Sequence, residues 1–179
     1  MTGEGFQVVD DRRAEPPSGV EVAALADRLK ERIYATITMV AVVVGLAMSE
    51  VGAVGAAATV LTTALGLWLA TFVADQQAHR TVHRGFATGH ALRRMLYVSS
   101  PLLSCAAGPA VMITLAALDV LSLHAALLVS AGVGVVSLFL YGCLGGMRMG
   151  GGALLAVMAG LADAAIGVVV VLVKVAAGH

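Results

Sequence analysis

Apolar residues in this chain gather into five long runs that are separated by short polar segments. The runs cover residues 33–49, 54–74, 95–118, 125–144 and 150–173. A helix that crosses a lipid bilayer needs about 20 apolar residues, within a range of about 17 to 25. Each run reaches that range, although the first only just does, so the pattern predicts five transmembrane helices.

Polar positions around these runs predict how the rest of the chain is organised. Residues 1–19 mix charges with Pro-Pro and glycine and have no periodic face, so we expect a disordered cytoplasmic tail. Residues 20–32 alternate apolar and charged positions, which is typical of an amphipathic helix that leads into the first span. Pro101 and the Gly108-Pro109 pair should kink the third span. Residues 20–175 would then form one membrane domain, with a cytoplasmic segment at 75–94.

The composition favours helices in a bilayer. Hydrophobic residues make up 59% of the 179 positions and charged residues 12%, whereas a soluble domain has about 25% charged residues. Alanine, glycine and valine are abundant, which suits close helix packing and not the alternating strands of a membrane barrel. The sequence therefore predicts an all-α, polytopic membrane protein. It contains no nucleophile beside a base and no basic stripe with aromatic platforms, so we expect neither an enzyme nor a nucleic-acid partner.

Arginine and lysine are distributed unevenly between the two ends of the predicted helices. Of the 11 such residues, all but Lys174 lie before the first span, between the second and third, or between the fourth and fifth. Positively charged loops stay on the cytoplasmic side of a membrane. We therefore expect the N-terminus in the cytoplasm and the C-terminus outside, in a multi-pass protein of the plasma membrane.

Asp163 is the only charged residue in the fifth run and falls in its middle. On a helix it shares one stripe with the small residues Ala156, Gly160 and Gly167, and small residues mark where membrane helices approach closely. The carboxylate is therefore expected to face protein or a wet crevice, and not lipid. Two interpretations stay open: an ion or proton site, or a protonated aspartate that bonds to a neighbouring helix.

A second group follows the second run, in the polar sequence DQQAHRTVHRGFATGH. If the helix continues past Asp75, then Asp75, His79 and His83 lie on one face at intervals of four residues. Carboxylate and imidazole together suit iron, manganese, zinc or nickel, so these three residues are candidate metal ligands. The alternative is a solvated helix end, with Arg80 and Arg84 touching lipid phosphates.

Glu31 lies where the amphipathic helix becomes the first span. Thr38 and Met39 follow it on the same helix with oxygen and sulfur side chains. Taken alone, Glu31 is best interpreted as an interfacial charge that pairs with Arg28 or Lys30.

The five-helix arrangement with an internal N-terminus resembles the vacuolar iron transporter family. ERIYATITMVAVVVG at the first span is similar to the family's first helix, which begins with an acid and continues with threonine-rich apolar sequence. LTTALGLWLATFVADQQAHR is similar to its second helix, and Gly108-Pro109 is similar to the kink of its third. The glycine-rich GLADAAIGVVV is similar to its last helix. Together these likenesses cover about residues 28–173.

This resemblance implies a homodimer in the lipid bilayer that moves Fe(II) or Mn(II) out of the cytoplasm in exchange for protons. The metal would be the transported ion, and the sequence points to no other cofactor. Glu31 stands where the family has a metal-binding aspartate, so it would be the cytoplasmic gate, with Asp163 as the intramembrane proton or ion site. Leu67 and Thr71 stand where the family has a metal-binding methionine and a glutamate, and residues 75–94 replace its glutamate-rich cytoplasmic helices.

Two functions from different classes follow. The first is a proton-coupled transporter of a divalent cation, in which Asp75, His79 and His83 capture the ion. The second is a non-transporting membrane protein of the same fold that binds a partner or organises lipid. The absent methionine and glutamate ligands and the small-residue helix faces favour the second.

Overall fold

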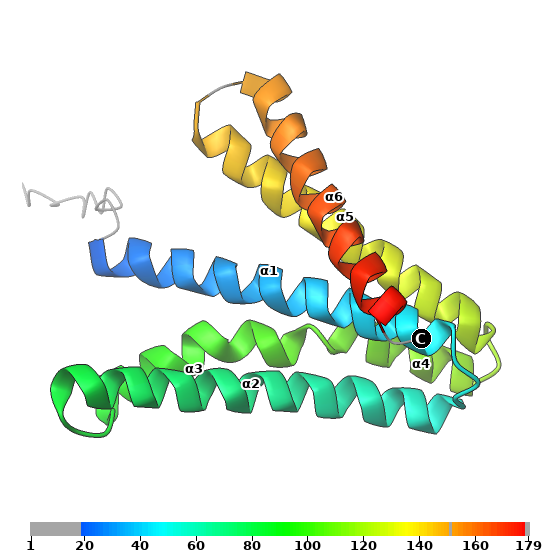
Figure 1. Ribbon diagram of the computed structural model, residues 1–179, viewed down its shortest axis with the longest axis horizontal. Helices are drawn as coiled ribbons and strands as arrows, with labels where there is room; N and C mark the ends of the chain where they lie inside the picture. The colour runs from blue at the N-terminus through cyan, green and yellow to red at the C-terminus, as the bar shows by residue number, and fades with distance from the viewer. Residues whose placement is uncertain (1–18, 151, 178–179) are drawn as a thin grey trace, which may run out of the picture.

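The computed structural model describes residues 19–150 and 152–177, and every regular element in these ranges is an α-helix (Figure 1). The all-α prediction is therefore confirmed. The tail expected at residues 1–19 lies outside the described residues except for Gly19, with which the first helix begins. The helices are α1 (Gly19–Ala47), α2 (Ala53–His83), α3 (Gly89–Ser104), α4 (Ala107–Ala117), α5 (Leu123–Arg148) and α6 (Gly152–Ala177).

Four helical segments are long and apolar enough to cross a membrane: α2, the Gly89–Ala117 segment that joins α3 and α4, α5 and α6. They are compatible with a helical membrane protein. Helix α1 is not among them, because only residues 33–47 lie between Arg32 and its last residue, a rise of about 22 Å at 1.5 Å per residue. The hydrocarbon core of a bilayer is about 30 Å thick. The first of the five expected spans, at 33–49, therefore stays a prediction.

Helix α1 is the centre of the bundle. The amphipathic helix expected at 20–32 and the first apolar run form one continuous helix, which lies between α2–α4 on one side and α5–α6 on the other (Figure 1). Its second half supplies much of the buried core, with Ala35, Met39, Val40 and Val43 each at most 4% exposed. The bundle therefore buries its least apolar long helix and leaves large apolar side chains of the other helices on the outside.

The third run is broken, as its prolines predict. Helix α3 ends at Ser104 and α4 begins at Ala107, so the chain turns at residues 105 and 106. Pro109 has no N–H to donate to the carbonyl of Cys105, and its ring disfavours a continuous helix there. The Cys105 N–H still bonds to the Pro101 carbonyl at 3.0 Å, which completes the last turn of α3.

Helices α5 and α6 form a tightly packed antiparallel hairpin. A Cβ atom added to Gly142 would lie 2.7 Å from the Cα of Gly160, and one added to Gly146 would lie 2.5 Å from the Cα of Ala156. Small residues four apart on both helices therefore let the two backbones touch. This contact is made by main chain, so no side-chain movement could accommodate a larger residue there.

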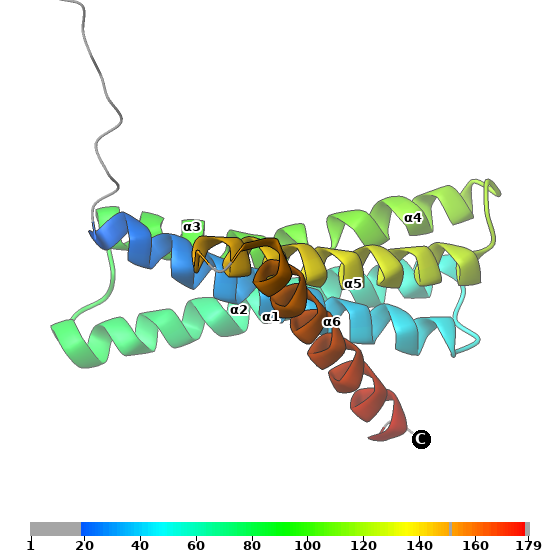
Figure 2. The ribbon, with the colours of Figure 1, turned by 90° about the horizontal axis from the view of Figure 1, so that it is seen from above.

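The hairpin crosses α1 near the middle of that helix. A Cβ atom on Gly134 of α5 would collide with the side chain of Val40, and one on Gly167 of α6 would lie 4.0 Å from Ile37. Away from this crossing α6 leaves the bundle obliquely, as Figure 2 shows. The crossing therefore fixes how α5 diverges from the first half of α1.

The end of the bundle opposite the start of α1 is closed by short connections. Ser122 caps α5 by accepting a hydrogen bond from the Ala125 N–H at 3.2 Å. His124 Nδ1 lies 3.0 Å from the carbonyl oxygen of Ala47, the last residue of α1. This contact ties the start of α5 to the end of α1 and satisfies a carbonyl that has no partner within its own helix.

The hairpin contact gives a test of the fold. We expect Gly146→Ala to lower the free energy of unfolding by about 1–3 kcal/mol, because the new methyl group meets backbone atoms of α6. Gly132→Ala is the matched control, since it lies on the same helix with no heavy atom within 4 Å of its Cβ position. Unfolding of both variants in mixed micelles by SDS measures the difference, and equal stabilities would contradict the contact.

Candidate functional site

At one end of the bundle α1 begins, α2 ends and α3 begins (Figure 1), and charged and histidine side chains of these helices line a common cavity. A cavity of about 610 Å³ opens there between these three helices, and we call it the polar-end pocket. Its walls combine acids, histidines and two basic groups with a few apolar residues. The lining residues are Asp27, Lys30 and Glu31 of α1, Asp75, Ala78, His79, Val82 and His83 of α2, and His90, Ala91, Arg94, Met95 and Val98 of α3.

Helix α1 supplies the acids of one wall. The side chain of Glu31 is 16% exposed, and its Oε1 atom lies 3.7 Å from Nζ of Lys30, which is 71% exposed. Of the two partners considered for Glu31, Lys30 is therefore the one that pairs with it. An ion pair with so exposed a partner contributes only about 0–1 kcal/mol. Both Glu31 and Lys30 line the pocket.

Helix α2 supplies the second wall. It continues past Asp75 to His83, so Asp75, His79 and His83 do lie on one face at intervals of four, and all three line the pocket. The rings of His79 and His83 are in contact, with centroids 4.4 Å apart. The structure thus brings the predicted ligands of α2 and Glu31 of α1 to the same cavity.

The connection from α2 to α3 positions the third wall. Arg84 ends α2 in the left-handed conformation at φ 54°, which reverses the chain. The Ala87 N–H then donates to Oε1 of Gln76 at 3.1 Å, which fastens the connection back onto α2. As a result His90, near the start of α3, lines the same pocket as the histidines of α2.

Asp75 lies just past the apolar run 54–74, and its surroundings disfavour its charged form. Burial has the largest effect and raises the pKa of the Asp75 carboxyl above its ordinary value. The Lys30 ammonium lowers this pKa, and the Asp27 carboxylate raises it further. A carboxyl group with a raised pKa takes up a proton more readily and is well suited to exchange it for a cation.

The pocket is not a closed metal centre. Within residues 19–150 and 152–177, no three side chains of histidine, cysteine, aspartate or glutamate lie close enough together to hold one metal ion. The role of Asp75, His79 and His83 as metal ligands therefore stays a prediction.

Asp163 lies elsewhere. On α6 its Oδ2 atom would be 2.7 Å from a Cβ added to Gly142, so the carboxylate rests against the backbone of α5. Asp163 is partly buried and lines neither the polar-end pocket nor the two other cavities found among the described residues. The structure therefore groups Glu31 with Asp75, His79 and His83, and keeps Asp163 apart from them.

Sequence reasoning missed two members of the pocket, Asp27 and His90. Asp27 precedes Glu31 by four residues on the same helix, so a helical count would have placed both acids on one face. His90 closes the same polar segment that contains His79 and His83. Its approach to them depends on the chain reversal at Arg84, which the sequence pattern does not specify.

Comparisons with protein-family models, with curated proteins and with solved structures found no match to this chain. They neither support nor oppose the resemblance to vacuolar iron transporters, which stays a prediction.

The raised pKa of Asp75 predicts how stability depends on pH. In the folded chain the ionised carboxylate costs free energy above its raised pKa, and this cost disappears as the pH falls toward the ordinary value. We expect Asp75→Asn to raise the Tm at pH 7.5, and the gain to shrink as the pH approaches about 4. Thermal unfolding in detergent between pH 7.5 and about pH 4 measures this gain in Tm.

Asp119→Asn is the matched control, because that carboxylate is exposed in the connection between α4 and α5. A Tm gain for Asp75→Asn that is the same at pH 7.5 and pH 4, or that Asp119→Asn reproduces, would contradict the effect of burial on Asp75.

Proposed function

We propose that this protein carries a cation across a membrane in exchange for protons, as its resemblance to vacuolar iron transporters implies. The cation would be divalent, with Fe(II) and Mn(II) as the first candidates. The active form would be a homodimer of five-span subunits in the plasma membrane, with the N-terminus in the cytoplasm. Most oligomers are symmetric, and pairing two subunits would give this odd number of helices the symmetry that one chain lacks.

The observation that supports transport is the shared pocket of Glu31, Asp75, His79 and His83 at the arginine-rich end of the bundle. Asp27 adds a third carboxylate to it. Clefts lined by one sign of charge concentrate counter-ions by about 10- to 1000-fold, and Lys30 and Arg94 reduce this effect in the polar-end pocket. The pocket would therefore collect cations on the cytoplasmic side, with Glu31 at the entrance to the bundle.

Asp163 would supply the proton site. A carboxylate within an apolar span costs about 3 kcal/mol or more, so such residues usually serve a function. Because Asp163 lies between α5 and α6, a change in its charge would act on the closest helix contact of the bundle. Protonation could thus be coupled to movement of the hairpin against α1.

One observation favours the second candidate, a non-transporting protein that binds a partner or organises lipid. Asp163 rests on the Gly142 backbone and lines none of the three cavities. In that arrangement a protonated carboxyl group could simply hold α5 and α6 together. Transport measurements separate the two functions directly.

We expect purified protein in liposomes to move Mn(II) or Fe(II) under a pH gradient. Asp163→Asn should reduce this flux to the leak of empty liposomes, because the amide cannot carry a proton, whereas Asp163→Glu should retain part of it. Absence of flux in the wild type, or equal flux in wild type and Asp163→Asn, would reject the transport role of Asp163 and favour the second candidate.

Glu31→Gln tests the pocket separately from the proton site. We expect it to lower flux by about tenfold at low cation concentration, because the local enrichment is reduced, and to approach wild-type flux at high concentration. Asp119→Asn is the control, since that acid does not line the polar-end pocket. An equal effect of both substitutions would contradict a specific role of the pocket.

The proposed orientation predicts which positions are accessible from each side. In a background without Cys105 and Cys143, we expect Glu50→Cys to react with an impermeant maleimide added outside cells. Arg84→Cys should react only after the membrane is opened. Reaction of both positions from the outside would contradict the proposed number of spans or their direction.

A further inference from the structure

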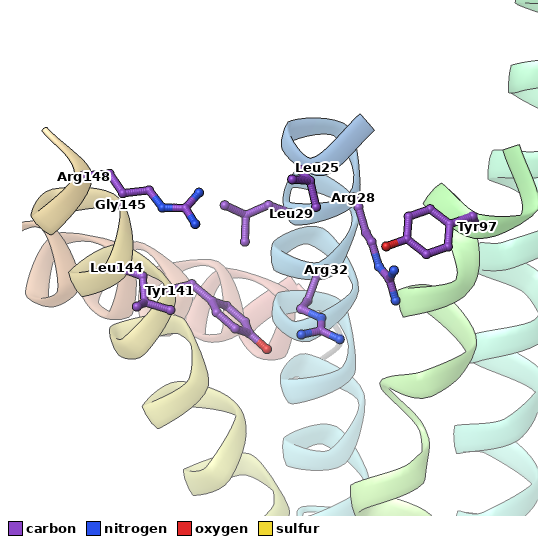
Figure 3. A pocket seen from close by; sticks show the side chains of 9 residues that line it. All are labelled: Leu25, Arg28, Leu29, Arg32, Tyr97, Tyr141, Leu144, Gly145 and Arg148. Atoms are coloured by element: carbon purple, nitrogen blue, oxygen red, sulfur yellow. The ribbon is translucent and has the colours of Figure 1, made fainter. Parts of the chain in front are cut away.

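A second cavity opens beside a neighbouring face of α1, between α1, α3 and the last turns of α5 (Figure 3). It has a volume of about 400 Å³, and three arginines line it: Arg28 and Arg32 of α1 and Arg148 of α5. Figure 3 shows Arg148 extending from α5 toward α1. No carboxylate is found among the described side chains that line this cavity, so its electrostatic potential is positive.

Two tyrosines hold the arginines of α1 in place. The guanidinium carbon of Arg28 lies 4.1 Å from the ring centroid of Tyr97, and that of Arg32 lies 6.0 Å from the ring centroid of Tyr141. A guanidinium group over an aromatic ring keeps the N–H donors in its own plane free for other partners. Such planar donors match the oxygens of a phosphate group.

An apolar cavity adjoins this basic one. Arg32 and Tyr141 line both, and the second cavity extends along α1 with a volume of about 690 Å³. Met39, Met112 and Val133 are among its walls. The hydroxyls of Ser130 and Ser137 in the same wall donate to carbonyls of their own helix at 2.8 Å. Its lining is therefore suited to a hydrocarbon chain.

The placement of charge on α1 separates this site from the polar-end pocket. With 3.6 residues per turn, Arg28 and Arg32 lie about 100° around α1 from Asp27 and Glu31, so the two pairs project from neighbouring faces. The charged side chains of the basic cavity are all arginines, whereas the polar-end pocket combines its acids with Lys30 and Arg94. The aromatic rings of Tyr97 and Tyr141 also suit the headgroup level of a bilayer.

We propose that the two adjoining cavities bind one anionic phospholipid. Its phosphate lies between the guanidinium groups of Arg28, Arg32 and Arg148, and one acyl chain enters the cavity beyond Arg32 and Tyr141. A free phosphate would use only the first cavity. Because Arg32 and Tyr141 line both cavities, one ligand with a charged head and an apolar chain can occupy the two together. This proposal holds whether or not the protein transports a cation.

The test is binding of dioleoyl phosphatidylglycerol to the delipidated full chain, followed by native mass spectrometry. We expect it to bind more tightly than dioleoyl phosphatidylcholine, and Arg28→Gln with Arg32→Gln to weaken its binding by about tenfold or more, because two charge-assisted hydrogen-bonding groups are lost. Arg84→Gln with Arg93→Gln removes the same charge outside the three cavities and should change binding less than twofold. Arg28→Lys with Arg32→Lys should retain most of the affinity, which separates recognition from misfolding.

A separate variant tests the apolar cavity, which would hold the acyl chain. Gly108 lines the apolar cavity and has no heavy atom within 4 Å of its Cβ position, so Gly108→Leu can fill part of the space. We expect it to weaken phosphatidylglycerol binding, whereas Gly66→Leu, at an open position of α2, should not.

Three results would overturn the proposal. The first is equal affinity for phosphatidylglycerol and phosphatidylcholine, which would show that the anion is not recognised. The second is displacement of the lipid by millimolar inorganic phosphate, which would identify a free-anion site. The third is equal loss of binding in the Arg28/Arg32 and Arg84/Arg93 glutamine variants, which would reduce the effect to overall charge.

Discussion

The positions of Asp163 and of the basic cavity depend on the close approach of the α5 and α6 backbones. Glycines at 142, 146 and 160 remove the side chains that would hold the helices apart. Gly134 then lets this hairpin cross α1 at Val40, and beyond the crossing α5 diverges from the first half of α1. The divergence opens the basic cavity, and the hairpin contact itself holds Asp163 against α5. Larger residues at these glycines would therefore disturb two sites as well as the packing of the hairpin.

Helix α1 organises the charges at the polar end. Its first half places Asp27 and Glu31 on one face and Arg28 and Arg32 on a neighbouring face. Helix α3 lines the cavities at both faces, together with α2 at the first and α5 at the second. Helices α2 and α3 enclose the acids together with Asp75 and the histidines, while α5 brings Arg148 to the arginines. Because Glu31 and Asp75 line one cavity and Arg28 and Arg32 line another, a cation and an anionic headgroup could bind at the same end of the protein without competing.

The acids that the sequence suggested for one pathway are divided between different helix pairs. Glu31 joins Asp75 between α1, α2 and α3, whereas Asp163 lies between α5 and α6. Helix α1 stands between these two groups (Figure 1). Coupling between a cation in the polar-end pocket and a proton on Asp163 would pass through α1 and its crossing with the hairpin, or through α4, which packs against both α2 and α5.

The sequence by itself determined the local features of this protein. Its apolar runs specify the helices, Pro109 explains the break between α3 and α4, and the spacing of Asp75, His79 and His83 follows once α2 continues. Only the tertiary structure decided that α1 is central, that Asp163 meets Gly142, and that Arg148 lines one cavity with Arg28 and Arg32. The physical reason is that lipid tails are as apolar as leucine, so hydrophobic patterns predict that a helix enters a bilayer but not which of its faces meets another helix. Those choices depend on contacts between residues that are distant in the chain, and on close backbone approach at a few glycines.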